Sequence, residues 1–142
     1  TQVNRYRSRI SGPLLDRIDI QVEVSNVDYE DLSSTENSET SAEIKKRVNK
    51  TRKLQLERYK DYNIYSNSQL DAGMLKKFCP LGEEENAILR AAFDNLGLSA
   101  RAHSRILKVA RTIADLEGSE NIKSEHIAEA IQYRSLDRKY FE

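Results

Sequence analysis

From Thr40 onward, apolar residues recur at three- and four-residue spacing in segments that begin at capping residues and end at glycine or proline. This pattern is typical of amphipathic helices that pack against one another. Thr40 and Glu43 form a capping-box pattern ahead of a helix that we expect to reach Tyr59. We expect further helices over residues 68–79, 82–96 and 99–117, and a last one that Ser124 caps, before a charged tail over residues 137–142. The sequence therefore predicts a mainly α chain with a bundle of about four to five helices.

Each expected helix has an apolar face that we predict to be buried. The residues are Ile44, Val48, Thr51 and Tyr59 in the first helix, Leu70, Met74 and Phe78 in the second, Ile88, Leu89, Ala92, Phe93 and Leu96 in the third, Ala102, Ile106, Val109, Ile113 and Leu116 in the fourth, and Ile127, Ala130 and Ile131 in the fifth.

The region before these helices has a different pattern. Residues 1–9 are expected to form a short helix, which Gly12 and Pro13 end. Apolar residues then alternate with polar ones over residues 18–24, which predicts one β-strand. Because a lone strand is not stable, we expect its partners in sequence outside this chain. The predicted division is an α/β remnant over residues 1–24, an acidic linker over 25–39 and a helical domain over 40–142.

The charges of the chain balance overall but separate locally. The 142 residues include 23 lysines and arginines and 23 aspartates and glutamates. Residues 25–43 contain six acids and no base, whereas residues 45–60 contain eight bases and one acid. A block of one sign is usually a solvated surface. The basic helix is also a candidate contact for DNA or a protein partner, and the sequence leaves both interpretations open.

Few residues are suited to chemistry of their own. The chain has no GxxxxGK[ST] phosphate loop, and one cysteine with two histidines at unhelpful spacing does not predict a zinc site. Cys79 is expected to be structural, and His103 and His126 are expected at the surface or its boundary. A lone cysteine fits a reducing compartment, and no apolar run is long enough for a membrane span. We therefore expect a cytoplasmic protein with no membrane contact.

The stretch SGPLLDRIDIQVEV places Arg17 between Asp16 and Asp19 at the start of the predicted strand. A guanidinium is always charged, and its planar fork suits contact with phosphate. Arg17 is therefore either a partner of the two neighbouring aspartates or a ligand of a phosphate beyond its own domain. On chemistry alone, the salt bridge is favoured.

The stretch GLSARAHSRILKVARTIADLEG places Arg101 in the first turn of the fourth predicted helix. Arg105 and Lys108 follow on the same face, where like charges repel weakly. A bound anion at the helix N-terminus would relieve this repulsion. Ion pairs with Glu83, Glu84 or Asp94 across the bundle would do the same, and the sequence does not decide between the two.

These segments, taken in order, resemble the magnesium-chelatase clade of AAA+ ATPases. The LLDRID motif is similar to the arginine-finger segment after sensor 1, and the Arg101 segment followed by SEHIAEAIQYR is similar to the sensor-2 helix and the last helix of the lid. The chain as a whole resembles the C-terminal part of the Mg-chelatase-like YifB/ComM family. The resemblance implies a helical AAA+ lid, preceded by a short helix and one strand left from the α/β ATPase core.

The resemblance also implies a function for the longer protein. It would be a ring-forming, hexameric ATPase that uses ATP and Mg²⁺ and acts on DNA as a branch-migration helicase. Arg17 matches the arginine finger, acting on nucleotide held by the adjacent subunit, with Asp16 and Asp19 holding its guanidinium in place. Arg101 matches the sensor-2 arginine, and Arg105 is a weaker nucleotide-binding candidate.

The resemblance leaves alternatives open. Walker A, Walker B and sensor 1 are expected before Thr1, so this chain alone is not expected to bind ATP tightly or to hydrolyse it. One alternative is a helical DNA- or protein-binding module with no catalytic contribution. Another is an ATPase subunit of magnesium chelatase itself.

Overall fold

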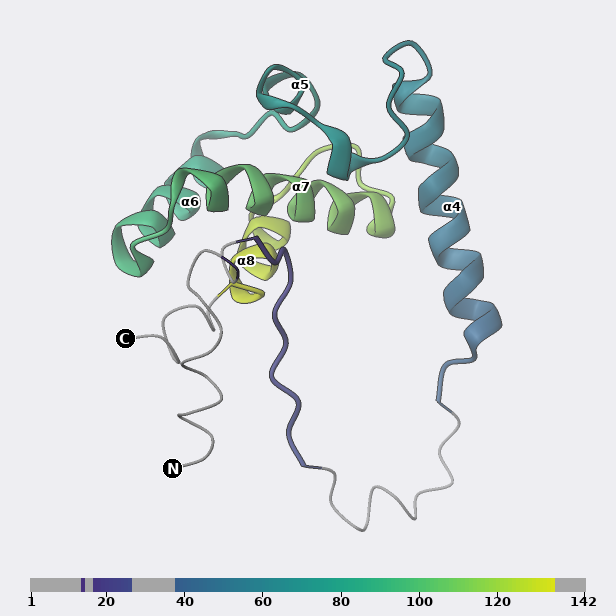
Figure 1. Ribbon diagram of the computed structural model, residues 1–142, viewed down its shortest axis with the longest axis horizontal. Helices are drawn as coiled ribbons and strands as arrows, with labels where there is room; N and C mark the ends of the chain where they lie inside the picture. The colour runs from purple at the N-terminus through teal and green to yellow at the C-terminus, as the bar shows by residue number, and fades with distance from the viewer. Residues whose placement is uncertain (1–13, 15–16, 27–37, 135–142) are drawn as a thin grey trace.

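The chain folds as a helical bundle. The structure is a computed structural model that describes residue 14 and residues 17–26 and 38–134. Within these residues it contains α4 (Ser41–Tyr59), the short 3₁₀ helix η1 (Asn67–Gln69), α5 (Ala72–Phe78), α6 (Glu83–Leu96), α7 (Ala100–Glu117) and α8 (Ser124–Gln132) (Figure 1). This confirms the prediction of a mainly α fold.

Helix α7 lies at the centre of the bundle. It contacts α8, α4, α5 and η1, and α8 in turn contacts α6. The side chain of Ile106 on α7 and that of Ile127 on α8 are fully buried. The ring of Tyr59, at the end of α4, meets Phe78 of α5 edge-on, with the ring centres 5.0 Å apart. One core therefore joins the described helices.

The helix ends largely follow the capping residues of the sequence. The Thr40 hydroxyl accepts from the Glu43 N–H, and the Glu43 carboxylate accepts from the Thr40 N–H at 2.8 Å, which confirms the capping box. Gly97 and Gly118 end α6 and α7 with φ values of 59° and 83°, a region that other residues rarely adopt. The expectation that Ser124 caps α8 is wrong. Lys123 is the N-cap, and the Ser124 hydroxyl donates to Glu85 instead.

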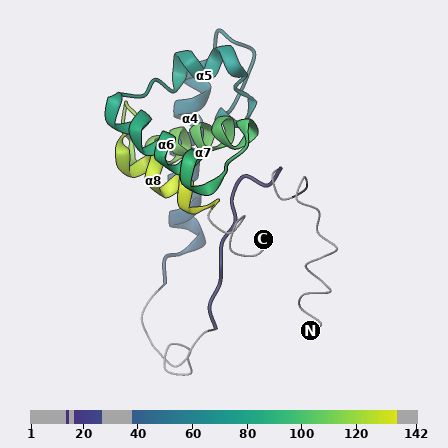
Figure 2. The same ribbon diagram turned by 90° about the vertical axis from the view of Figure 1, so that its left-hand side faces the viewer.

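The first half of α4 is not packed as the sequence predicts. Ile44 and Val48 are 42% and 44% exposed, and the buried side chains of α4 are Thr51, Gln55 and Tyr59. In both ribbon views the N-terminal end of α4 extends past the body formed by α5 to α8 (Figures 1 and 2). Its first turns therefore have few described neighbours to bury an apolar face against. Leu116, near the end of α7, is likewise exposed although we predicted it to be buried.

The predicted strand does not form. Residues 17–26 are free of strand structure, and Val22 and Val24 are exposed. In this segment the one backbone hydrogen bond to another part of the described chain is from the Gln21 N–H to the Tyr133 carbonyl, at 2.9 Å. The alternating pattern fits a strand, but no neighbouring strand is present in the described chain to complete a ladder. The predicted helix over residues 1–9 and most of the predicted linker lie outside the described residues.

No described helix is both long enough and apolar enough to cross a lipid bilayer.

Candidate functional site

The first candidate arginine, Arg101, lies in the first turn of α7. Ser99 caps this helix, with its hydroxyl accepting from the Ala102 N–H at 3.2 Å. The side chain of Arg101 is exposed, and none of the hydrogen bonds and ion pairs within the described residues involves it. An unpaired cation close to free backbone N–H groups is the arrangement that attracts an anion.

The next two cations on this face of α7 have partners. Arg105 forms an ion pair with Asp19, and the Lys108 ammonium donates to the Ser68 carbonyl at 2.8 Å. Arg105 and Lys108 therefore do not form the ion pairs with Glu83, Glu84 or Asp94 that the sequence left open. Sequence spacing could not show this, because Asp19 lies 86 residues away along the chain.

The second candidate arginine, Arg17, belongs to the segment that carries Asp19. The backbone turns here, with the Arg17 N–H donating to the Leu14 carbonyl at 3.0 Å, and the side chain of Arg17 is exposed. Of the two aspartates expected to hold it, Asp16 lies outside the described residues. Asp19 forms its ion pair with Arg105 on α7, a partner that the sequence did not predict.

A third arginine fixes the same segment to the end of α8. Arg134 is 2% exposed, and its guanidinium donates to the Ile18 carbonyl at 2.7 Å. The bond from the Gln21 N–H to the Tyr133 carbonyl lies beside it. The structure thus joins the segment of Arg17 to the helix of Arg101, at Arg105, and to the residues that follow α8. Arg17 is exposed on this segment, and Arg105 holds the segment through Asp19. The contact of Arg134 with the segment was not predicted from the sequence.

A buried polar cluster stabilises the centre of the bundle and was also missed. The carboxylate of Asp115 on α7 is fully buried and accepts hydrogen bonds from four side chains. Two of these are the forked contact from Arg58, at 2.5 and 2.8 Å, and the bond from Arg111 Nε, at 3.1 Å. The others come from the amides of Asn67, at 2.9 Å, and Gln55, at 3.3 Å.

This cluster explains why the polar side chains of Gln55, Asn67 and Arg111 are buried. It ties α4, η1 and α7 together, and Arg111 extends it to the carbonyls of Ser119 and Glu120. A buried carboxylate is tolerated because its hydrogen-bonding capacity is filled by cations and amides. The spacing of Arg111 and Asp115, four residues apart on a face with buried alanines, was the one available signal. The role is structural.

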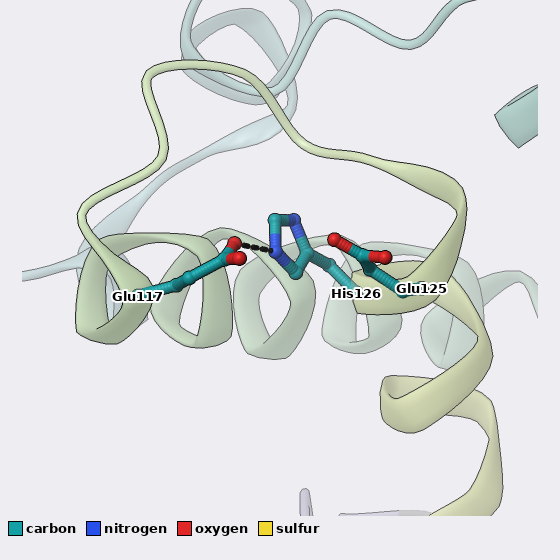
Figure 3. A group of neighbouring side chains, drawn as sticks. All are labelled: Glu117, Glu125 and His126. Carbon is teal, nitrogen blue, oxygen red and sulfur yellow. Dashed lines mark hydrogen bonds and ion pairs between the residues drawn. The ribbon is translucent and has the colours of Figure 1, made fainter.

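Glu117, Glu125 and His126 form a second cluster, where α7 ends and α8 begins (Figure 3). Their potential ligand atoms lie within 4.8 Å of one another. His126 is 3% exposed, so the expectation of a surface or boundary position is wrong for this residue. His103, by contrast, is exposed as expected.

The donor set of this cluster does not fit a metal ion. His126 Nδ1 accepts from the Lys123 backbone N–H at 3.0 Å, which places the ring proton on Nε2, facing Glu117 at 2.5 Å. A protonated nitrogen has no lone pair to offer. The Lys123 ammonium lies 3.3 Å from Glu117 and 3.2 Å from Glu125. It therefore supplies the positive charge that a metal ion would bring to these two carboxylates. We interpret the cluster as a clasp between two helices.

Cys79 is buried, as expected of a structural residue. Burial raises the pKa of its thiol to about 11. Tyr59, at the end of α4, and Tyr62, three residues later, both meet the ring of Phe78 edge-on. Tyr65 is exposed.

Comparison with known proteins agrees with this architecture. Residues 38–134 match the family model of the magnesium chelatase subunit ChlI C-terminal region, and residues 1–32 match that of magnesium chelatase subunit ChlI. The competence protein ComM of Haemophilus influenzae is 43% identical over 138 residues, and the uncharacterised protein YifB of Escherichia coli is 41% identical over the same length.

These alignments cover 96% of this chain and 26% of each relative, so the chain spans about a quarter of their length. An uncharacterised protein of Mycobacterium tuberculosis is 29% identical over 92% of the chain. The match over residues 38–134 includes every helix described above. The chain therefore belongs to the family of the magnesium chelatase subunit ChlI C-terminal domain.

Proposed function

We propose that this chain is the lid and arginine-finger segment of a ring-forming AAA+ ATPase. In this proposal, Arg17 reaches the γ-phosphate of ATP bound to the adjacent subunit, and Arg101 contacts phosphate held by its own subunit. Arg105 has a supporting role. ATP and Mg²⁺ bind to the complete protein, where the metal neutralises charge on the phosphates and the two arginines stabilise the charge that develops during transfer.

The observation that carries this proposal is the state of Arg101. It is an exposed arginine without a described partner in the first turn of a capped helix, and this helix lies in a domain of the magnesium chelatase family. A cation in the first turn of a helix opposes the helix dipole. A phosphate bound against Arg101 and the N-terminal N–H groups would offset that cost.

The test uses the full-length protein that contains this chain. Arg17→Ala should lower the turnover of ATP by orders of magnitude while ATP affinity stays within a few-fold, because a finger acts on the transition state. Arg101→Ala should weaken both. Arg90→Ala, which removes an exposed arginine on α6, is the matched control and should hydrolyse ATP normally. Normal hydrolysis by Arg17→Ala would show that the finger assignment is wrong.

A second candidate function, contact with DNA, is supported by α4. Two of its seven cations are neutralised, since Arg47 pairs with Glu39 and Arg58 with Asp115. Lys60, which follows the helix, pairs with Glu57. The remaining five are exposed and have no partner among the described residues: Lys45, Lys46, Lys50, Arg52 and Lys53. The structure thus leaves much of the basic charge of this helix directed at solvent.

Three of these lysines lie in one row. At 100° per residue, Lys46, Lys50 and Lys53 fall on the face opposite Thr51 and Gln55, and they span about 10 Å of the helix axis. A row of cations at this spacing suits the regularly spaced phosphates of a nucleic-acid backbone. We therefore propose that α4 helps a cytoplasmic ATPase motor of the YifB/ComM type to hold DNA, consistent with a role as a branch-migration helicase.

Binding of a labelled DNA duplex at several salt concentrations tests this contact. The triple variant Lys46→Gln, Lys50→Gln, Lys53→Gln should bind more weakly, with a salt dependence lower by about 2 to 3 in log–log slope. Glutamine keeps the helix propensity of lysine. The control variant Lys60→Gln, Lys76→Gln, Arg90→Gln carries the same change in net charge. Equal losses in both variants would mean that α4 makes no specific contribution.

The magnesium-chelatase subunit remains the other alternative. ATP hydrolysis that is stimulated by DNA favours a DNA motor over it, because a chelatase subunit has no reason to respond to nucleic acid.

A further inference from the structure

Three contacts fasten the segment of Arg17 to the lid. The Asp19 carboxylate pairs with Arg105 of α7. The Ile18 carbonyl accepts from the guanidinium of Arg134 at 2.7 Å, and the Gln21 N–H donates to the Tyr133 carbonyl at 2.9 Å. The three residues of the segment that make these contacts lie within four positions of Arg17. Two of them, Ile18 and Asp19, follow Arg17 directly in the sequence.

Arg134 is well placed to act as an anchor. Its side chain is 2% exposed, and a guanidinium stays charged even when it is buried. Burying a charge is costly unless it is hydrogen-bonded, so the Ile18 carbonyl helps to offset that cost. This makes the position of the segment and the packing of Arg134 depend on one another. The apolar side chains of the segment add little, because Val22 and Val24 are exposed.

Arg105 links this anchor to the other candidate arginine. It follows Arg101 by one turn of α7, so a movement of the helix that repositions Arg101 also moves the partner of Asp19. Asp19 in turn lies two residues after Arg17. The chain of contacts from Arg101 to Arg17 runs through a single helical turn, one ion pair and one short stretch of backbone.

We propose that Arg105 and Arg134 are positioning residues that couple the lid to the arginine finger of the same subunit. When nucleotide draws Arg101 toward its phosphates, α7 carries Asp19 with it, and the finger that serves the neighbouring subunit moves too. This inference rests on the proposed function of Arg17 and Arg101. It deepens that function by assigning a route through which one ATP site in the ring regulates the next.

The first test needs no activity and uses the 142-residue chain. Hydrogen exchange of the Gln21 N–H reports directly on docking of the segment, because its bond to Tyr133 exists only when the segment is docked. Asp19→Asn and Arg134→Gln should each speed this exchange about tenfold or more, the scale set by losing a hydrogen bond to a charged group. The amides of α7 should keep their protection in Asp19→Asn.

Lys108→Gln is the matched control. It removes a cation from the same face of α7, but one whose partner is the Ser68 carbonyl and not the Arg17 segment. Exchange at Gln21 should stay unchanged in this variant. Because Arg134 is buried, Arg134→Gln could unfold the lid, and the exposed variant Asp19→Asn then decides the question. Unchanged exchange at Gln21 in Asp19→Asn would overturn the proposal.

The second test measures ATP hydrolysis by the full-length protein. Asp19→Asn and Arg105→Gln should each lower kcat by roughly tenfold to a hundredfold, the scale of a misplaced catalytic group, with KM nearly unchanged, and should reduce cooperativity between sites. The swapped pair Asp19→Arg with Arg105→Asp should recover much of the loss, which general destabilisation would not explain. Full kcat and cooperativity in Asp19→Asn would contradict the proposal.

The two proposals fail in distinguishable ways. If Arg17→Ala abolishes turnover while Asp19→Asn has no effect, the finger assignment stands and the coupling is wrong. If Arg17→Ala itself has no effect, the proposed function is wrong, and the exchange data then describe docking of the segment alone.

Discussion

At the scale of single residues, the most consequential side chain of the bundle is Asp115. Its carboxylate is buried between Arg58 and Arg111 and collects hydrogen bonds from three elements. Apart from its four-residue spacing from Arg111, nothing in the local sequence marks it, because an aspartate near the end of an amphipathic helix is ordinarily solvated. The sequence predicted an apolar face on each helix, whereas the structure places a buried polar cluster where α4, η1 and α7 meet.

Replacing Asp115 should therefore destabilise the chain strongly. Asp115→Ala leaves two guanidinium groups at a buried site without their counter-charge, and breaking a buried ion pair in this way costs about 3–5 kcal/mol of unfolding free energy. Urea denaturation measures the loss. Asp94→Ala, at an exposed position on α6, should change stability by less than about 0.5 kcal/mol. A similarly small effect of Asp115→Ala would contradict the role assigned to the cluster.

Cys79 offers a second prediction at this scale. Burial raises the pKa of its thiol to about 11, so little reactive thiolate is present near neutral pH. At pH 8 the folded chain should react with a thiol reagent more slowly than the urea-unfolded chain by on the order of a hundredfold. Absorbance during labelling follows the reaction. Equal rates for the folded and unfolded chains would show that Cys79 is accessible.

At the scale of helices, the sequence predicted those features that depend on residues close by in the chain. The helix over 82–96 and the one after Ser99 were placed correctly, because their ends are fixed by local hydrogen bonds and by glycines with positive φ. The predicted strand failed for the opposite reason: a strand depends on a partner elsewhere, and residues 17–26 have none in the described chain.

The same reasoning explains which parts of the candidate site could be predicted from the sequence. The arginines could be found from the sequence because Arg17 and Arg101 lie in motifs. The partner of Arg105 and the burial of Arg134 could not, because both contacts join residues more than 80 positions apart. The exposure of Ile44 and Val48 was likewise hidden, since helical spacing shows that a face is apolar but not that another helix covers it.

The clasp between α7 and α8 predicts a dependence on pH. Hydrogen bonds from His126 and Lys123 lower the pKa of the Glu117 carboxyl. A lowered pKa in the folded chain stabilises it above the ordinary glutamate pKa, about 4.3, and this contribution is lost as the pH falls through the lower value. Glu117→Gln should therefore be less stable than the wild type at pH 7, and the difference should shrink below about pH 4.

Urea denaturation from pH 7 to pH 3 measures this difference. Glu120→Gln, an exposed change three residues away, is the control and should follow the wild type throughout. A constant gap between Glu117→Gln and the wild type at every pH would mean that the ionised clasp does not contribute to stability.

At the scale of the whole molecule, the chain presents two sets of exposed cations on one bundle. One set, on α4, is directed at solvent, and we propose that it meets DNA. The other consists of Arg101 at the start of α7 and Arg17 on the docked segment, and we propose that it meets phosphate. The contacts of Arg105 and Arg134 join the segment that carries Arg17 to the lid that carries Arg101, and we propose that the two arginines therefore move together.

The central claim is that Arg17 acts on nucleotide bound by a different subunit, and mixing subunits tests it directly. One variant of the full-length protein carries Arg17→Ala. The other keeps Arg17 but carries a substitution in the phosphate-binding loop that the family resemblance implies outside this chain. Each should be nearly inactive alone. Mixed rings should hydrolyse ATP well above the sum of the two, because intact fingers meet intact nucleotide sites at shared interfaces. Activity of the mixture equal to that sum would contradict a finger that acts between subunits.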